Sequence, residues 1–256
     1  MKKYTLITGA SSGLGLELAK LFGEDGNNLL LVSSSQSNLD NAKAELEKEV
    51  DVDIKTLAID LSDPANFKKV KQFTDNNDMS ILNLVNCAGF GDRTDFVDMD
   101  IDKQLKMVEL NCNAPMYLMH AYLKDMINAK EGHILNISSI AAFVPGPYMS
   151  TYHATKAFLT NLSEGIAREL KGTRVSLTTI CPGPFESNFV KKAGNDYTFS
   201  KIKPISAKKV ALISYKALKR KKTLKIIGLK NNLLMFFSKL LPRKLVTNTS
   251  ASQIKK

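Results

Sequence analysis

The sequence has few of the residues that build disulfide-linked or metal-centred sites. Its 256 residues contain three cysteines, Cys87, Cys112 and Cys181, and no C-x-x-C spacing joins them. They predict neither a disulfide framework nor a structural zinc site, and we expect reduced thiols in a cytoplasm. The three histidines are scattered and no carboxylate pattern accompanies them. We therefore expect no metal site.

Long apolar runs are missing as well. No stretch approaches the roughly 18 apolar residues that a transmembrane helix needs. The apolar run after the two N-terminal lysines ends within a few residues, so it predicts a first strand rather than a signal peptide. With 44% apolar and 24% charged residues, the composition is typical of a folded globular chain.

Acidic residues are missing from the last fifth of the chain. Residues 201–256 contain 16 Lys and Arg and no Asp or Glu, whereas residues 1–200 contain 20 Lys and Arg and 25 Asp and Glu. An apolar, helix-like stretch at 233–246, with a proline stop or kink, lies within this basic segment. It is expected either to pack over a substrate cleft or subunit interface, or to rest on an anionic membrane surface. No base-reading motif accompanies the charge, so we expect no nucleic-acid partner.

Strand-like and helix-like runs alternate along the chain. Strands are predicted over residues 4–8, 28–32, 53–60, 81–85, 133–138, 174–180 and 223–228. Helices are predicted over about 13–25, 38–49, 101–129 and 151–171, and a further helix opens at Pro64. The strands lack polar alternation, which is typical of a parallel sheet covered on both faces. We predict a single doubly wound, Rossmann-type α/β domain with a mostly or wholly parallel sheet of about seven strands.

A glycine-rich turn, T-G-A-S-S-G-L-G (8–15), follows the first predicted strand. Gly9, Gly13 and Gly15 allow a tight turn and a close approach of the backbone. The helix that follows offers free N–H groups and a positive dipole end to a phosphate. Three glycines in a turn can also be merely structural, but the strand–turn–helix context favours phosphate binding.

Three further motifs stand at the ends of later strands: N-C-A-G (86–89), a serine followed by Y-H-A-T-K (152–156), and C-P-G-P (181–184). Each is weak alone, because strand-terminating turns are common and Y-x-x-x-K often occurs by chance. Tyr152 and Lys156 lie four residues apart and therefore share one face of a helix. His153 is expected to point away from that face.

In this order, the motifs resemble those of the short-chain dehydrogenase/reductase family. The resemblance covers about residues 3–190, with Cys87 where the family often has asparagine. The remainder resembles a bacterial branch with a longer C-terminal segment. The resemblance implies a nicotinamide cofactor, a ketone or alcohol substrate and a homodimer or homotetramer. Residues 1–200 would form the dinucleotide-binding and catalytic core, and residues 201–256 would complete the same domain.

The resemblance also implies catalytic roles. Reduction of a carbonyl by hydride creates an alkoxide that needs a proton, and Tyr152 would supply it. Lys156 and an oxidised nicotinamide would lower the pKa of that phenol, and Lys156 would also bond the nicotinamide ribose. Ser139, 13 residues before the tyrosine, would hold the substrate oxygen, with Ser138 as the rival. Asn111 matches the position that holds a proton-relay water, or it is a capping or packing residue.

The same resemblance implies the contacts to the cofactor. They are Gly9, Ser11, Ser12, Gly13, Leu14, Gly15, Ser33, Ser34, Ser35, Asp60, Leu61, Asn86, Ala88, Gly89, Tyr152, Lys156, Pro182 and Gly183. The second strand is followed by neither the acid that binds the ribose of NAD nor the arginine that binds the phosphate of NADP. Its serines can donate to phosphate, so NADP is favoured over NAD. Asp60 matches an adenine-contacting aspartate, or it caps the helix ahead of Pro64.

Three functions follow from this reading. The first is a carbonyl reductase or alcohol dehydrogenase, with every catalytic position filled. The second is a reductase of an acyl or other lipophilic ketone at a membrane surface, cytoplasmic and peripheral to the inner membrane. The third is a non-catalytic, cofactor-binding regulatory or scaffold protein. Such a protein would tolerate the loss of Tyr152 or Lys156, and both are present.

Overall fold

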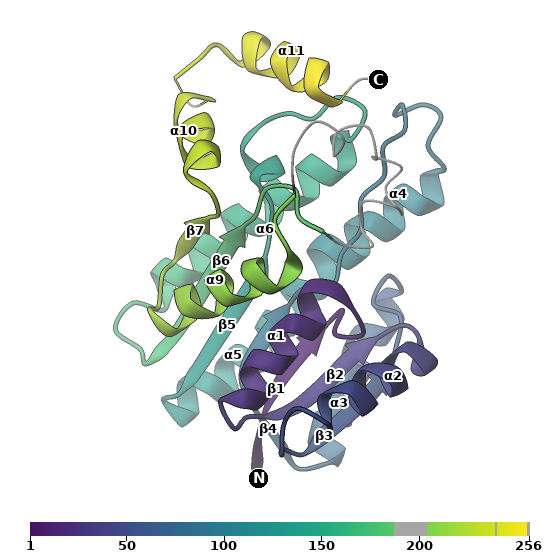
Figure 1. The fold of residues 1–256 in the computed structure, drawn as a ribbon, viewed down its shortest axis with the longest axis vertical. Helices are drawn as coiled ribbons and strands as arrows, with labels where there is room; N and C mark the ends of the chain where they lie inside the picture. Colours follow the sequence, from purple (N-terminus) through teal and green to yellow (C-terminus); the bar gives the residue numbers. More distant parts are fainter. Residues whose placement is uncertain (187–203, 239, 255–256) are drawn as a thin grey trace.

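Seven parallel strands form one sheet in the computed structural model, which describes residues 1–186, 204–238 and 240–254 (Figure 1). The end of the expected catalytic core and the start of the basic segment, at 187–203, lie outside the described residues. The strands are β1 Lys2–Thr8, β2 Asn28–Ser33, β3 Ile54–Ala58, β4 Met79–Asn86, β5 Gly132–Ile137, β6 Val175–Cys181 and β7 Leu224–Ile226. Their order is β3-β2-β1-β4-β5-β6-β7. The predicted doubly wound fold is confirmed.

The sheet order reverses between β1 and β4, which pair directly. The chain first runs outward from β1 through β2 to β3, and then returns to the middle of the sheet. In open parallel sheets, ligands bind at the carboxyl ends of the strands on either side of such a reversal. The glycine-rich turn follows β1 and the N-C-A-G motif follows β4, so the two motifs meet at this point.

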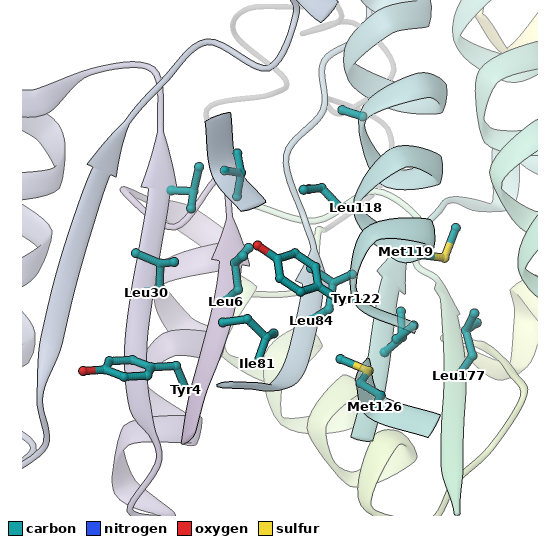
Figure 2. Packing of buried hydrophobic residues seen from close by; sticks show 14 of the residues in the cluster. Tyr4, Leu6, Leu30, Ile81, Leu84, Leu118, Met119, Tyr122, Met126 and Leu177 are labelled. Carbon is teal, nitrogen blue, oxygen red and sulfur yellow. The ribbon is translucent and has the colours of Figure 1, made fainter. Parts of the chain in front are cut away.

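Helices cover both faces of the sheet over two separate cores. One core packs α1 Gly13–Glu24, α2 Gln36–Leu46 and α9 Ala207–Lys219 against the sheet, and the other packs α3 Phe67–Asn76, α5 Ala114–Ala129 and α6 Ser150–Glu169. Successive side chains of a strand point to opposite faces of the sheet and so enter different cores. In β2, Leu29 and Leu31 enter the first core and Leu30 enters the second. Figure 2 shows the second core, where Leu118 and Tyr122 of α5 lie over β1 and β4.

The helix predicted over 101–129 is interrupted. The structure has α4 Ile101–Val108, a π-helical turn Glu109–Asn113, and then α5. A π turn widens the helix by one residue and is often found at functional sites. Pro115 follows at the start of α5, where a missing N–H is tolerated. The interruption places Asn111 inside the π turn.

The basic segment continues beyond β7 as two helices, α10 Leu229–Ser238 and α11 Arg243–Ile254. Pro242 lies between them, so the apolar stretch 233–246 is divided where a proline stop was expected. Neither α9 nor the full length of α11 was predicted. In Figure 1 the two helices form the yellow arm beyond the end of β7. None of the described helices is long and apolar enough to cross a bilayer.

Candidate active site

The glycine-rich turn needs its glycines for two different reasons. Gly9 and Gly13 have φ of +68° and +56°, a left-handed conformation that favours glycine. A Cβ on Gly15 would lie 2.2 Å from the Gly9 oxygen, whereas one on Gly13 would meet no described atom within 4 Å. Ser12 precedes α1 and makes no side-chain capping bond to it. The turn thus offers N–H groups and open space to an anion, which fits a dinucleotide phosphate.

Thr8 joins this turn to the loop after β4. Its hydroxyl accepts hydrogen bonds from the backbone N–H groups of Cys87 and Ala88, at 3.0 and 3.1 Å. A Cβ on Gly9 would lie only 3.0 Å from the Ala88 backbone. The sequence analysis gave Thr8 no role. The sequence did contain a signal for this residue: Thr8 is the last residue of β1 and directly precedes Gly9, the first glycine of the turn.

The three serines at the end of β2 and directly after it differ in what they bond. Ser33 shares a hydrogen bond of 2.9 Å with Ser11 of the glycine-rich turn. Ser35 caps α2 by accepting from Asn38 N, at 3.4 Å. Ser34 is exposed. Of the three predicted cofactor contacts, Ser33 and Ser34 therefore fit a phosphate subsite better than Ser35, because the Ser35 hydroxyl is already used to cap α2.

Asp60 does not cap the helix that follows it. Its carboxylate accepts from the backbone N–H and the hydroxyl of Ser62, at 2.9 and 2.8 Å. The cap ahead of Pro64 is Asp63, which accepts from Ala65 N at 2.9 Å. The capping alternative for Asp60 is therefore wrong, because the turn at 60–62 places a second aspartate at the capping position. A surface hollow of about 550 Å³ between β3 and α3 includes Asp60 but none of the predicted catalytic residues.

Ser139, Tyr152 and Lys156 come together at the carboxyl end of β5. Ser139 precedes a short 3-10 turn, Ile140–Phe143, and accepts from Ala141 N at 3.1 Å. Its side chain also acts on Tyr152, where it favours a lower pKa of the phenol. The Lys156 ammonium lies 5.8 Å from the centroid of the Tyr152 ring.

Ser138, the rival for the serine role, faces the other way. Its hydroxyl donates to the Lys156 carbonyl oxygen at 3.1 Å and shares a bond of 2.7 Å with Thr160. Both partners lie on α6, and Ser138 is buried. His153 is likewise turned away, with Nδ1 2.8 Å from the Val144 oxygen.

Burial shifts both titrating groups of the pair toward their neutral forms. It raises the pKa of Tyr152 to about 12, and the Ser139 side chain offsets only part of the rise. It lowers the pKa of Lys156 to about 8. A lowered tyrosine pKa was expected from Lys156 together with an oxidised nicotinamide, and for the site with cofactor bound it stays a prediction. In the protein alone desolvation is the largest cause of the shift, and the Lys156 ammonium donates to the Ile137 oxygen at 3.0 Å.

Asn111 is buried in the π turn, and its amide is fully engaged. Oδ1 accepts from Phe90 N at 3.1 Å, and Nδ2 donates to Phe90 O at 2.9 Å and to the Thr155 hydroxyl at 3.1 Å. The side chain therefore holds the loop after β4 against α6, as the packing alternative required. A Cβ on Gly89 would lie 2.9 Å from Asn111 Oδ1 and 3.4 Å from Lys156 Nζ. Thr155, which the sequence analysis missed, is signalled by its place one helical turn after Tyr152.

The turn after β6 contacts α10. A Cβ on Gly183 would lie 2.6 Å from Nδ2 of Asn231, on α10. That amide donates to the Ile227 oxygen at 2.7 Å. The sequence analysis missed Asn231, since no motif marks a tertiary contact between distant segments. Among the described residues, no group of three or more His, Cys, Asp or Glu could hold a metal ion.

A model of the short chain dehydrogenase family matches residues 3–198. The chain belongs to this family. Family membership makes it an oxidoreductase, and the seven-stranded parallel sheet is shared with solved structures of this kind. The resemblance noted in the sequence is confirmed over the region that carries the motifs.

Two solved structures are similar to this short-chain dehydrogenase over most of its length. One is a short-chain dehydrogenase from Sphingobium yanoikuyae in complex with NADPH, at 28% identity and a TM-score of 0.83, covering 94% of this chain and 95% of the other. The second is a bulky-bulky ketone specific alcohol dehydrogenase from Comamonas testosteroni, at 28% identity and a TM-score of 0.78, covering 94% and 93%.

A curated relative is a very-long-chain 3-oxoacyl-CoA reductase of Pyrenophora tritici-repentis, 33% identical over 174 residues. The match takes in 66% of this short-chain dehydrogenase and 50% of the relative. The chain thus spans about half the length of that reductase.

Proposed function

We propose that this short-chain dehydrogenase interconverts a ketone and an alcohol by hydride transfer with a nicotinamide cofactor. The observation that carries the proposal is that Tyr152 lies beside Ser139, whose side chain acts to lower the phenol's pKa, and beside the Lys156 ammonium, 5.8 Å from the ring centroid, at the carboxyl end of β5. A nucleophile–base pair is not needed for such chemistry. A proton donor beside an oxygen-binding hydroxyl is what carbonyl reduction requires.

The cofactor would lie across the reversal between β1 and β4. Gly9, Gly13 and Gly15 would admit its phosphates, and Asn86, Ala88 and Gly89 would line the crevice after β4. The remaining proposed contacts are Ser11, Ser12, Leu14, Ser33, Ser34, Ser35, Asp60, Leu61, Tyr152, Lys156, Pro182 and Gly183. When bound, the nicotinamide supplies or accepts the hydride.

Residues of the chain would handle the proton. The Tyr152 phenol, with a pKa of about 12, is fully protonated at neutral pH and would donate to the developing alkoxide. Ser139 would hold the same oxygen and share its charge. Lys156, with a pKa of about 8, is largely cationic at neutral pH and would bind the ribose. Asn111 would keep the loop after β4 and the π turn in register with α6, and a relay water would use the backbone of that turn.

The proposal is tested by following NADPH oxidation with a panel of ketones. We expect measurable turnover with at least one bulky ketone, since support comes from a similar alcohol dehydrogenase that acts on bulky-bulky ketones. The non-catalytic alternative predicts tight NADPH binding without turnover on any ketone or, in the reverse direction, any alcohol. That result would contradict the proposed activity but would be consistent with the fold and with the cofactor site.

We further propose that NADP is preferred over NAD, as the similar NADPH-bound dehydrogenase supports. Ser33→Asp places a carboxylate at the end of β2, where it would repel a 2′-phosphate and accept from a ribose hydroxyl. We expect the ratio of kcat/KM for NADPH over NADH to fall by at least about tenfold, or ~1.4 kcal/mol. Ser34→Arg is the matched control and should raise that ratio. A Ser33→Asp ratio equal to that of the wild type would contradict the placement of the phosphate.

The second candidate is a reductase of lipophilic ketones at the inner surface of a bacterial membrane. Two observations favour it: apolar side chains exposed on α10, and the 3-oxoacyl-CoA reductase among the relatives. We propose a cytoplasmic homodimer or homotetramer in which residues 1–200 form the catalytic core. Residues 201–256 would complete the same domain and cover its cleft.

A further inference from the structure

The C-terminal arm, defined as α10, α11 and the link between them, crosses the catalytic end of the sheet. Asn231 lies against Gly183 after β6, and α10 contacts the 3-10 turn that follows Ser139. At the far end, the Ile254 oxygen accepts from Arg93 Nε at 2.8 Å, in the loop after β4. The arm is therefore attached at the ends of three consecutive strands, which Figure 1 shows as the yellow helices over the top of the molecule.

The inward side of the arm is buried. On α10 this side carries Met235, 4% exposed. On α11 it carries Val246, Ser250 and Ile254, spaced four residues apart and buried. These buried side chains attach the arm to the core, so the opposite side of the arm takes no part in that attachment.

That opposite side is apolar and exposed. Large apolar side chains, each between 46% and 78% exposed, are Leu229, Leu233, Leu234, Phe236, Phe237, Leu240, Leu241 and Leu245. At 3.6 residues per turn, those on α10 fall within an arc of about 160° opposite Met235. Isolated exposed leucines need no explanation, but a continuous apolar helix face marks a surface that binds something.

Cations accompany this apolar face. Lys230 lies within the same arc of α10, and Arg243 and Lys244 open α11; all three are exposed. No Asp or Glu occurs between residues 201 and 256. Two copies of the arm placed face to face would therefore bring cations together with no acid to pair them, which disfavours a symmetric dimer through this face. An apolar face edged by cations matches an anionic bilayer surface.

We propose that the C-terminal arm docks this protein on anionic phospholipid, with the apolar side of α10 inserted at the headgroup boundary. The docked orientation turns the carboxyl ends of β4, β5 and β6 toward the lipid. Only the purpose of docking rests on the proposed function: the docked protein would take a lipophilic ketone from the bilayer. Docking itself needs neither cofactor nor substrate.

The test is sedimentation of the full chain with vesicles of phosphatidylcholine alone or of phosphatidylcholine mixed with phosphatidylglycerol. We expect binding to the anionic vesicles that weakens with added salt. Phe236→Ser combined with Phe237→Ser should lower the partition coefficient at least tenfold, and Arg243→Gln combined with Lys244→Gln should lower it severalfold. The matched controls are Ile127→Ser, at the end of α5 that leads into β5, and Lys48→Gln with Lys124→Gln. They change exposed side chains away from the docking face and should bind as the wild type does.

Turnover of a small water-soluble ketone with NADPH is measured on the same proteins and separates the two proposals. Equal vesicle binding by the wild type and both arm variants would overturn docking, whatever the turnover. If the phenylalanine variant instead changes from oligomer to monomer and the wild type ignores vesicles, the face is a contact between copies, and docking is again overturned. Loss of vesicle binding with turnover retained supports it.

Discussion

Tyr152→Phe is expected to lower kcat for ketone reduction by about 10²- to 10⁴-fold, the usual contribution of a positioned general acid. The change removes one oxygen from a half-buried ring and leaves its packing in place. With the phenol pKa raised to about 12 by burial, the hydroxyl of the wild type is a proton donor across the neutral range. The variant has no proton at that position, and Ser139 alone is too weak an acid to replace it.

Binding and catalysis should separate in this variant. The chain contains no tryptophan, so the rise in NADPH emission on binding can be followed without interference from protein fluorescence. We expect the NADPH affinity of Tyr152→Phe to stay within about threefold of the wild type. Tyr117→Phe, the same change on a partly exposed residue of α5, is the control and should keep full turnover. Full turnover by Tyr152→Phe would remove the tyrosine from the mechanism.

The sheet and the motifs could be predicted because both depend on residues that are neighbours in the sequence. Buried strands such as Asn28–Ser33 are continuous apolar runs, and a glycine with positive φ, such as Gly9, needs only its own neighbours to be recognised. The strand ends therefore fell within a few residues of their observed positions. Parallel pairing then brings the ends of β1, β4, β5 and β6 to one edge without further information.

Features that depend on distant contacts could not be predicted. The π turn around Asn111 exists together with bonds to Phe90 and Thr155, 21 and 44 residues away. The arm depends on Asn231 and Arg93 reaching other loops. The lowered pKa expected for Tyr152 rests on Lys156 and an oxidised nicotinamide, whereas the desolvation that raises it in the protein alone depends on how the whole site is covered.

Because Lys156 is desolvated, we expect its replacement by an uncharged side chain to give a protein that is inactive and yet more stable than the wild type. The lysine is buried with its pKa lowered from 10.5 to about 8. The folded state thus holds the cation at a cost of about 3 kcal/mol, at ~1.36 kcal/mol per pKa unit. Lys156→Met keeps the length of the side chain and removes the charge. It also removes a hydrogen bond to the Ile137 oxygen, which offsets about 1 kcal/mol.

We therefore expect Lys156→Met to be about 2 kcal/mol more stable than the wild type at pH 7 by urea denaturation, and at least about 100-fold less active. The pH dependence follows from linkage. Below pH 8 the lysine is charged in both folded and unfolded chains and the full cost applies. As the pH rises from 8 to 10.5, the unfolded chain binds more protons, the wild type gains stability, and the advantage of the variant disappears.

The control is Lys124→Met, which changes an exposed lysine on α5 and should alter stability by less than about 0.5 kcal/mol. If Lys156→Met is less stable than the wild type at pH 7, the cation stabilises the fold and its pKa is not lowered. If it is more stable at every pH by the same amount, the gain comes from packing rather than charge. A gain that fades between pH 8 and 10.5 indicates that this site keeps a buried cation at the expense of stability, as a site selected for ribose binding and proton transfer would.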